Sequence, residues 1–134
     1  MTVDPASASV SPSILIVDGD IVSRHVIADY LRRCAYAVVE AASTDEALVA
    51  LGEPSLSIDV ILCDVSALGS QSGFEFACWV RANRPELEVR LAAGVETAAQ
   101  TAAELCESGP HLERPFQPEE VIDYIKRLRA SRIA

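Results

Sequence analysis

The stretch Ile14-Leu-Ile-Val-Asp18 is a continuous apolar run that ends in an acid. Apolar runs without alternation are typical of β-strands that helices cover on both faces of a sheet. The stretch Val60-Ile-Leu-Cys-Asp64 has the same form and also ends in an aspartate. We therefore predict two parallel strands whose terminal acids, Asp18 and Asp64, lie at the same edge of one sheet.

Segments with helical spacing alternate with these apolar runs along the chain. We predict helices at Asp20 to Cys34, Ser43 to Gly52, Gly73 to Asn83, Glu96 to Ser108 and Pro118 to about Arg129. Further strands are predicted at Ala37 to Ala41, at Leu87 to Ala92 and around Leu112. Five strands alternating with five helices indicate an α/β fold, a doubly wound parallel sheet with helices on both faces. Ligands bind such sheets beyond the carboxyl ends of the strands, so Asp18 and Asp64 mark the candidate site.

Length and charge limit the kind of protein. The chain has 134 residues, and 20 acidic against 11 basic side chains give it a formal net charge of −9. One domain is expected at this length, over residues 13–130, with tails at residues 1–12 and 131–134. The negative charge disfavours nucleic acid as a partner, and no apolar run approaches the ~20 residues that span a membrane. Because the start of the chain has no signal segment, we expect a cytoplasmic protein.

Two other classes of function find little support in the residues. A flavin- or nucleotide-binding domain of this fold would carry a Gly-rich or Ser/Thr-rich loop after its first strand, and Asp18-Gly-Asp-Ile-Val22 is not such a loop. An enzyme would need a nucleophile with a base beside it, and neither Cys63 nor any serine has a histidine placed near the strand ends. The cysteines are widely spaced in apolar contexts, which predicts buried thiols at Cys34, Cys63, Cys78 and Cys106.

Several motifs occur in a fixed order along nearly the whole chain. They are Ile14-Leu-Ile-Val-Asp18, Val60-Ile-Leu-Cys-Asp64, Gly73 followed by Phe74-Glu-Phe76, and Arg114-Pro115-Phe116 before an acidic helix start. Together they resemble the receiver domain of two-component response regulators. The resemblance implies a flavodoxin-like sheet of five strands in the order 2-1-3-4-5. It also implies phosphoryl transfer from a histidine kinase to an aspartate, and Asp64 matches the position of that acceptor.

The resemblance further implies a metal-dependent site. An aspartate that attacks a phosphohistidine brings two anions together, so a divalent cation such as Mg²⁺ must neutralise the developing charge. The metal ligands implied here are Asp18, Asp20 and Asp64. In the family, a lysine pairs with one phosphate oxygen, and a Ser or Thr hydroxyl at the end of the fourth strand hydrogen-bonds another.

Two departures from the family pattern affect the metal and phosphate ligands. The family has two adjacent acids after its first strand, whereas here Asp18 is followed by Gly19. Asp20 lies one residue further on, and two roles stay open for it: a substitute metal ligand, or the N-cap of the following helix. Arg114 stands at the lysine position, which keeps the positive charge but exchanges a compact ammonium for a planar guanidinium.

Further departures affect the switch that links phosphorylation to the protein surface. Ala92 stands where the family places the switch hydroxyl, and alanine has no hydrogen-bond donor in its side chain. His111 falls at or near the aromatic switch position, where a histidine is polar and titrates near neutral pH. The loop from Val65 to Ser72 is longer than the family's usual loop and lacks its proline. The chain is therefore identified as an atypical, degenerate member of the family.

Two hypotheses about Asp64 follow. In the first, Asp64 forms a permanent salt bridge with Arg114 that imitates one signalling state, so phosphorylation is weak or absent. In the second, Asp64 still accepts phosphate from a histidine kinase, with Asp18 and Asp20 holding a weakly bound Mg²⁺ that keeps several waters.

Output is expected to pass through protein contacts rather than catalysis, because no helix-turn-helix candidate follows Arg129. The family's output face corresponds to Glu96 to Ser108, His111 to Glu113 and Pro118 to Arg129. Its expected partners are a histidine kinase, a phosphotransfer protein or a downstream effector, with a homodimer through the two helices of this face. The helix Glu96 to Ser108 offers mostly alanine to the core and is expected to be weakly anchored.

Overall fold

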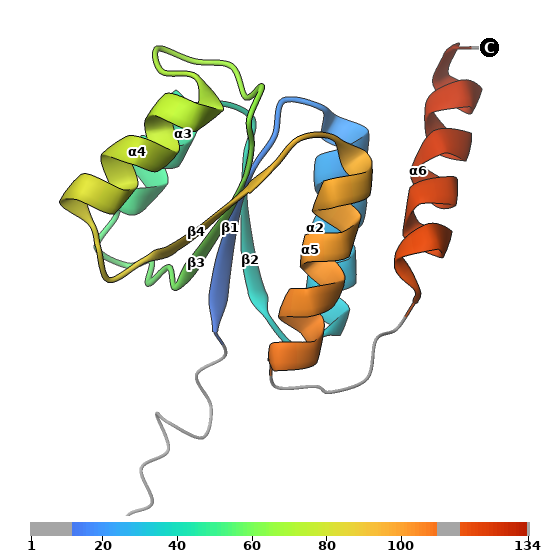
Figure 1. Cartoon of the computed structure of the whole chain (residues 1–134), viewed down its shortest axis with the longest axis horizontal. Coiled ribbons are helices and arrows are strands. Elements are labelled where there is room, and N and C mark those ends of the chain that lie inside the picture. The colour runs from blue at the N-terminus through green and yellow to red at the C-terminus, as the bar shows by residue number, and fades with distance from the viewer. Residues whose placement is uncertain (1–11, 110–115, 134) are drawn as a thin grey trace, which may run out of the picture.

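The computed structural model describes residues 12–109 and 116–133, which form a parallel sheet with helices on both sides (Figure 1). Along the chain, the elements are β1 (Ser13–Val17), α2 (Ile21–Arg33), β2 (Ala37–Ala41), α3 (Thr44–Leu51), β3 (Val60–Asp64), α4 (Gly73–Asn83), β4 (Glu88–Ala92), α5 (Val95–Ser108) and α6 (Pro118–Ile133). They match the predicted helices and strands in kind and order. Helix α6 continues to Ile133, beyond its predicted end near Arg129.

Among the described residues the sheet has four parallel strands, in the order β2-β1-β3-β4. The predicted order is thus confirmed for these strands, while the predicted count of five is corrected to four for the part of the chain that the structure describes. The segment around Leu112 lies within residues 110–115, outside the described residues, as do His111, Arg114 and most of the predicted tail at residues 1–12. The winding reverses between β1 and β3, so their carboxyl ends form the switch point where ligands bind such sheets.

Strand β1 is buried on both faces, which explains why its apolar run lacks alternation. Ile14 and Ile16 pack into the core shared with α2, α5 and α6, whereas Leu15 and Val17 pack into the core shared with α3 and α4. All four side chains are at most 3% exposed. Figure 1 shows these two helical layers on opposite sides of the sheet, with α6 outermost against α2 and α5.

A disulfide joins the end of α2 to α5, linking Cys34 to Cys106 with 5.4 Å between their Cα atoms. The prediction of a thiol is therefore wrong for these two cysteines, and Cys78 is exposed rather than buried; Cys63 is a buried free thiol, as predicted. Spacing along the chain does not reveal that two helices on the same side of the sheet bring Cys34 and Cys106 together. The bond anchors α5 covalently, and seven residues of this helix, Cys106 among them, are buried.

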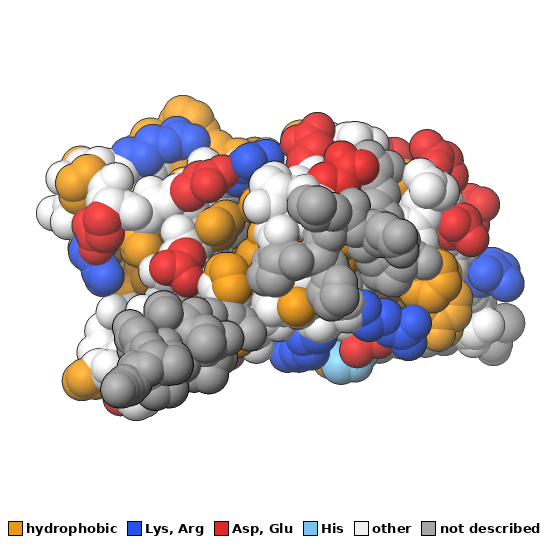
Figure 2. Space-filling model, turned by 90° about the horizontal axis from the view of Figure 1, so that it is seen from below, with side chains coloured by type: hydrophobic (Ala, Val, Ile, Leu, Met, Phe, Trp, Pro, Cys, Tyr) orange, Lys and Arg blue, Asp and Glu red, His pale blue; other side chains and the backbone are white. Residues whose placement is uncertain are grey.

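The surface carries charges of both signs. Figure 2 shows the face at the amino ends of the strands, where acidic and basic side chains are interspersed with hydrophobic ones. Within residues 12–109 and 116–133, no helix combines the length and the apolar character that crossing a bilayer requires.

Candidate functional site

The carboxyl ends of the strands border a small pocket of about 210 Å³. Its polar lining consists of Asp18, Asp20, Ser23, Arg24, Asp64 and Arg129, and Ala92 lines it as well. Asp18 follows β1 directly and Asp64 ends β3, so the predicted meeting of these two acids at one edge of the sheet is observed. The pocket lies at the switch point of the sheet.

Asp18 is held by the turn that leads into α2. Its Oδ1 accepts a hydrogen bond from the backbone N–H of Asp20 at 2.9 Å. Burial raises the pKa of Asp18 above its ordinary value, and the negative charges of Asp64 and Asp20 raise it further, against the opposing effect of that hydrogen bond. Asp64 and Asp20 therefore lie close enough to Asp18 for their charges to disfavour its ionised form.

Asp20 is the N-cap of α2. Its Oδ1 accepts the backbone N–H of Val22 at 3.0 Å, and its Oδ2 accepts the Ser23 hydroxyl at 3.3 Å. Oδ2 also accepts a hydrogen bond from the guanidinium of Arg129. Burial by itself would raise the pKa of Asp20, but the hydrogen bond and charge of Arg129 outweigh it, and the pKa lies below its ordinary value.

Arg129 is a site residue that sequence reasoning did not find, as are Ser23 and Arg24. Arg129 lies in the last part of α6, and its Nη2 donates both to Asp20 and, at 2.6 Å, to the Ser23 hydroxyl. The contact joins positions separated by 109 residues, so no local spacing reveals it. From sequence, a basic residue near a helix end is typical of a charge that complements the helix dipole.

The pocket lining also contains a second guanidinium, that of Arg24, whose partners are a backbone carbonyl and a carboxylate outside the pocket. Its Nη1 donates to the backbone carbonyl of Asp18 at 2.9 Å, and its Nε pairs with Glu40 at 3.1 Å, outside the pocket lining. Among the described side chains that line the pocket, Arg129 is therefore the cation that pairs with a carboxylate of the pocket.

Asp64 is the least engaged of the three acids. Its carboxylate forms no hydrogen bond or ion pair with any residue that the structure describes. Ala92 lies opposite it in the strand pairing and is 2% exposed, and its methyl group offers no donor to the pocket.

The neighbouring Cys63 is a buried thiol that stays protonated at neutral pH. Burial raises the pKa of its thiol to about 12, and the charges of Asp64 and Asp18 contribute to this shift. Because the thiolate is the reactive form of cysteine, Cys63 is unreactive at neutral pH.

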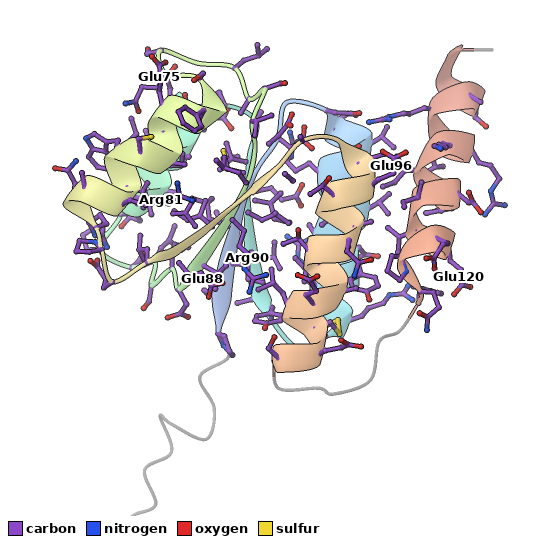
Figure 3. All side chains as sticks on the ribbon, viewed as in Figure 1. Glu75, Arg81, Glu88, Arg90, Glu96 and Glu120 are labelled. Carbon is purple, nitrogen blue, oxygen red and sulfur yellow. A yellow bond between two sulfur atoms is a disulfide. The ribbon has the colours of Figure 1, made fainter. Side chains whose placement is uncertain are left out.

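The long loop between β3 and α4 is pinned to the start of α3. The Thr44 hydroxyl donates to the Gln71 carbonyl at 2.7 Å. Helix α4 then begins with a capping box between Ser72 and Glu75. Figure 3 shows Glu75 near the start of that helix. Gly73 packs so closely on β3 that a Cβ atom there would collide with the carbonyl oxygen of Asp64, which explains the glycine of this motif.

The acidic residues do not form a ready-made metal site. Among the described residues, no three His, Cys, Asp or Glu side chains are grouped so that they could hold a metal ion. Both oxygens of Asp20 are already hydrogen-bonded. Asp18, Asp20 and Asp64 therefore share a pocket without the arrangement that Mg²⁺ requires.

Two candidate residues from the sequence, His111 and Arg114, lie outside the described residues. The salt bridge between Asp64 and Arg114 and the switch role of His111 therefore stay predictions.

A doubly wound parallel sheet with an acidic pocket at its switch point defines a flavodoxin-like α/β domain with a charged site. The chain belongs to the response regulator receiver domain family, whose model matches residues 14–126. Receiver domains are signalling domains of two-component systems, and they generally bind Mg²⁺ for phosphorylation.

Individual relatives agree with this assignment. The chain is 31% identical over 115 residues to the transcriptional regulatory protein ResD of Bacillus subtilis, covering 86% of this chain and 47% of ResD. It thus spans about half the length of that relative. A response regulator receiver domain protein from Clostridium thermocellum is 22% identical with a TM-score of 0.57, covering 89% of this chain and 98% of that chain. DrrB of Thermotoga maritima is 22% identical with a TM-score of 0.56, over 92% of this chain and 54% of that chain.

Proposed function

We propose that this chain is an atypical receiver domain that signals through protein contacts, with phosphorylation at Asp64 weak or absent. The observation that carries the proposal is the pairing of Asp20 with Arg129 inside the acidic pocket. Phosphoryl transfer to Asp64 needs a cation that can neutralise charge on the incoming phosphate. A guanidinium bound to Asp20 leaves the pocket less negative and leaves Asp20 unable to recruit such a cation.

The environment of Asp64 supports the same proposal. The Ala92 side chain cannot hydrogen-bond a phosphoryl oxygen, so it cannot couple phosphorylation to a movement of the following loop. A receiver without this coupling would present one fixed surface to its partners.

We propose that the partners are a histidine kinase, a phosphotransfer protein or a downstream effector, met in the cytoplasm. The surface of α5 and α6 is the proposed output face, including a homodimer contact through these helices. A net charge of −9 disfavours direct contact of this domain with nucleic acid.

A second candidate function is that of a working phosphoacceptor using Mg²⁺. One observation favours it: the Asp64 carboxylate lines the pocket and forms no hydrogen bond or ion pair with the described residues, so it is available for attack. In this case, Asp18 and Asp64 would hold a Mg²⁺ that retains most of its water ligands.

Phosphorylation of the purified chain separates the two candidates. We expect incubation with Mg²⁺ and acetyl phosphate to leave the intact mass unchanged, and beryllium fluoride to leave the NMR shifts around Asp64 unchanged. The matched control is Asp64→Asn, which removes the acceptor. A phosphoryl mass increase that is present in the wild type and lost in Asp64→Asn would overturn the proposal in favour of the second candidate.

A further inference from the structure

The disulfide between Cys34 and Cys106 lies where two helices end. Cys34 is the C-cap of α2, and Cys106 belongs to the last turn of α5, residues 105–108. Figure 3 shows the bond in yellow beside the lower end of α5. Both cysteines are 0% exposed, so a reductant reaches the sulfur atoms only when one of the two helix ends opens. Helix ends are also the parts of a helix that open most easily.

The end of α2 is fixed by its own backbone. Ala35 follows the helix in the left-handed conformation, with a φ of 74°, and its N–H donates to the Arg32 carbonyl at 3.0 Å. The Tyr36 N–H donates to the Leu31 carbonyl at 3.1 Å, which completes a Schellman motif. Strand β2 begins directly afterwards and pairs with β1. We therefore expect the end of α5, rather than that of α2, to open.

Tyr36 holds the last turn of α5 in place. Its hydroxyl donates to the Leu105 carbonyl at 2.6 Å, and this hydrogen bond is buried. Tyr36 also packs so closely on Gly109 that a Cβ atom there would collide with its hydroxyl. It belongs to the same buried cluster as Cys34 and Cys106. Burial raises the pKa of Tyr36 above its ordinary value, so the hydroxyl stays a donor at the mildly alkaline pH at which thiols react.

We propose that the bond between Cys34 and Cys106 is a thiol–disulfide exchange site that takes electrons from a dithiol, and that the last turn of α5 is its gate. The hydrogen bond from Tyr36 to Leu105 holds the gate shut while the disulfide is intact. Reduction removes the covalent link between α2 and α5, so the gate opens more often afterwards. The redox state of two buried cysteines is thereby converted into a change in the order of one helix end.

The exchange takes two steps. A thiolate of the dithiol attacks one sulfur atom of the disulfide, which forms a mixed disulfide and releases the other sulfur atom as a thiolate. The second thiol of the dithiol then breaks the mixed disulfide, and the dithiol leaves as a disulfide. Two electrons pass from the dithiol to the protein, and the two protons of the dithiol end on Cys34 and Cys106.

The setting of the proposed function fits such a site. A cytoplasmic chain meets thiol reductants, and the disulfides that occur there usually sense redox state or take part in catalysis. Helix α5 belongs to the proposed output face, so reduction would loosen one end of that face. This consequence rests on the proposed function, whereas the exchange itself does not.

The rate at which dithiothreitol reduces the native chain tests the gate. Samples are quenched with N-ethylmaleimide under denaturing conditions, and the intact mass shows two adducts, on Cys63 and Cys78, before reduction and four after it. The variant Tyr36→Phe keeps the ring but removes the hydroxyl that holds Leu105. We expect it to be reduced about fivefold faster than the wild type, the effect of one hydrogen bond.

The matched control is Tyr30→Phe. It makes the same chemical change at a tyrosine whose hydroxyl donates to the Phe116 carbonyl at 3.0 Å, away from the end of α5. We expect Tyr30→Phe to change the reduction rate by less than about twofold, because the contact of Tyr36 with Leu105 is intact. Equal reduction rates in Tyr36→Phe and Tyr30→Phe would overturn the proposal.

A urea series on the wild type tests the gate without any variant, and so it also decides the matter if Tyr36→Phe does not fold. Opening of one helix turn exposes little surface, so the reduction rate should change by less than about twofold in urea well below the unfolding transition. A rate that rises with urea as steeply as the unfolding equilibrium would show that only the unfolded chain is reduced, which refutes the gate.

Amide hydrogen exchange tests the release of the helix end. In the reduced chain, and in the double variant Cys34→Ala, Cys106→Ala, we expect the last turn of α5 to exchange about tenfold faster than in the oxidised wild type. The last turn of α4, residues 80–83, lies on the opposite face of the sheet and should be unchanged. Equal exchange in the last turn of α5 before and after reduction would contradict the release.

These readouts are independent of phosphorylation. A wild-type chain that takes phosphate from acetyl phosphate would refute the proposed function, whereas the exchange site is judged by reduction rate and amide exchange alone. Failure of one proposal is therefore distinguishable from failure of the other.

Discussion

Asp18 and Asp20 lie two residues apart, and their pKa values are shifted in opposite directions. Burial raises the pKa of Asp18, whereas Arg129 overcomes burial at Asp20 and lowers its pKa. The depressed pKa means that pairing with Arg129 stabilises the fold above the ordinary aspartate pKa, and that this stability is lost as the pH falls through the depressed value. Asp18 has the opposite sign: its ionised form costs stability at neutral pH, and acid removes that cost as the pH falls through the raised value.

The glycine between these acids provides a prediction at the residue scale. Gly19→Asp restores the pair of adjacent acids that the family has, and a Cβ there would lie 3.5 Å from the carbonyl oxygen of Ala42, an ordinary contact. We expect Gly19→Asp to bind Mg²⁺ about tenfold more tightly in a calorimetric titration, because a carboxylate is added to the site.

The control for this variant is Gly52→Asp. Gly52 is the C-cap of α3 and also has room for a side chain, so the variant adds the same charge at a position that does not line the pocket. Similar Mg²⁺ affinities in the two variants would show that Gly19 does not border the metal-binding edge.

At the scale of elements, the disulfide between α2 and α5 is the strongest single link. It closes a loop with a sequence separation of 72 residues. Beside it, the Tyr36 hydroxyl donates to the Leu105 carbonyl at 2.6 Å. Together these contacts fix α5, one of the two helices of the proposed output face, against α2.

Reduction of this bond should lower the free energy of unfolding by about 4 kcal/mol, the chain-entropy value for a loop of this length. Urea unfolding with and without reductant measures the change, and the double variant Cys34→Ala, Cys106→Ala should be insensitive to reductant. The unfolded, unreduced chain should show only the thiols of Cys63 and Cys78. Four titratable thiols, with equal midpoints in both conditions, would contradict the assignment.

The element scale also shows what the sequence can and cannot predict. The uninterrupted apolar runs of β1 and β3 predict strands buried on both faces, because each side of the sheet takes alternate residues. Their terminal acids then follow at one edge. The partner of Cys34 is not predictable in this way, because periodicity describes one element at a time and the bond joins two.

The same reasoning applies to the pocket. Asp18 and Asp64 could be placed from the ends of two strands, and the N-capping role of Asp20 from its position before a helix. Arg129 could not, because its place depends on how α6 docks on α2, a packing result with no local signal. The one side chain that changes the interpretation of the pocket is therefore the one that only the three-dimensional structure supplies.

At the scale of the whole molecule, an acidic chain contains an acidic pocket whose charge is partly neutralised by Arg129 of the same chain. The net charge of −9 would draw divalent cations toward the protein in general. The guanidinium of Arg129 opposes this at one carboxylate, and the same contact fastens the last helix. The charge of the pocket and the docking of the end of α6 therefore both depend on the contact between Arg129 and Asp20.

An NMR titration of the Asp20 carboxyl carbon tests this account most directly. In the wild type, the midpoint should lie below the ordinary value of 3.8, and in Arg129→Gln it should shift upward, because burial remains when the guanidinium is gone. A midpoint that is the same in both proteins would contradict the account, since Arg129 would then not be the cation that Asp20 holds.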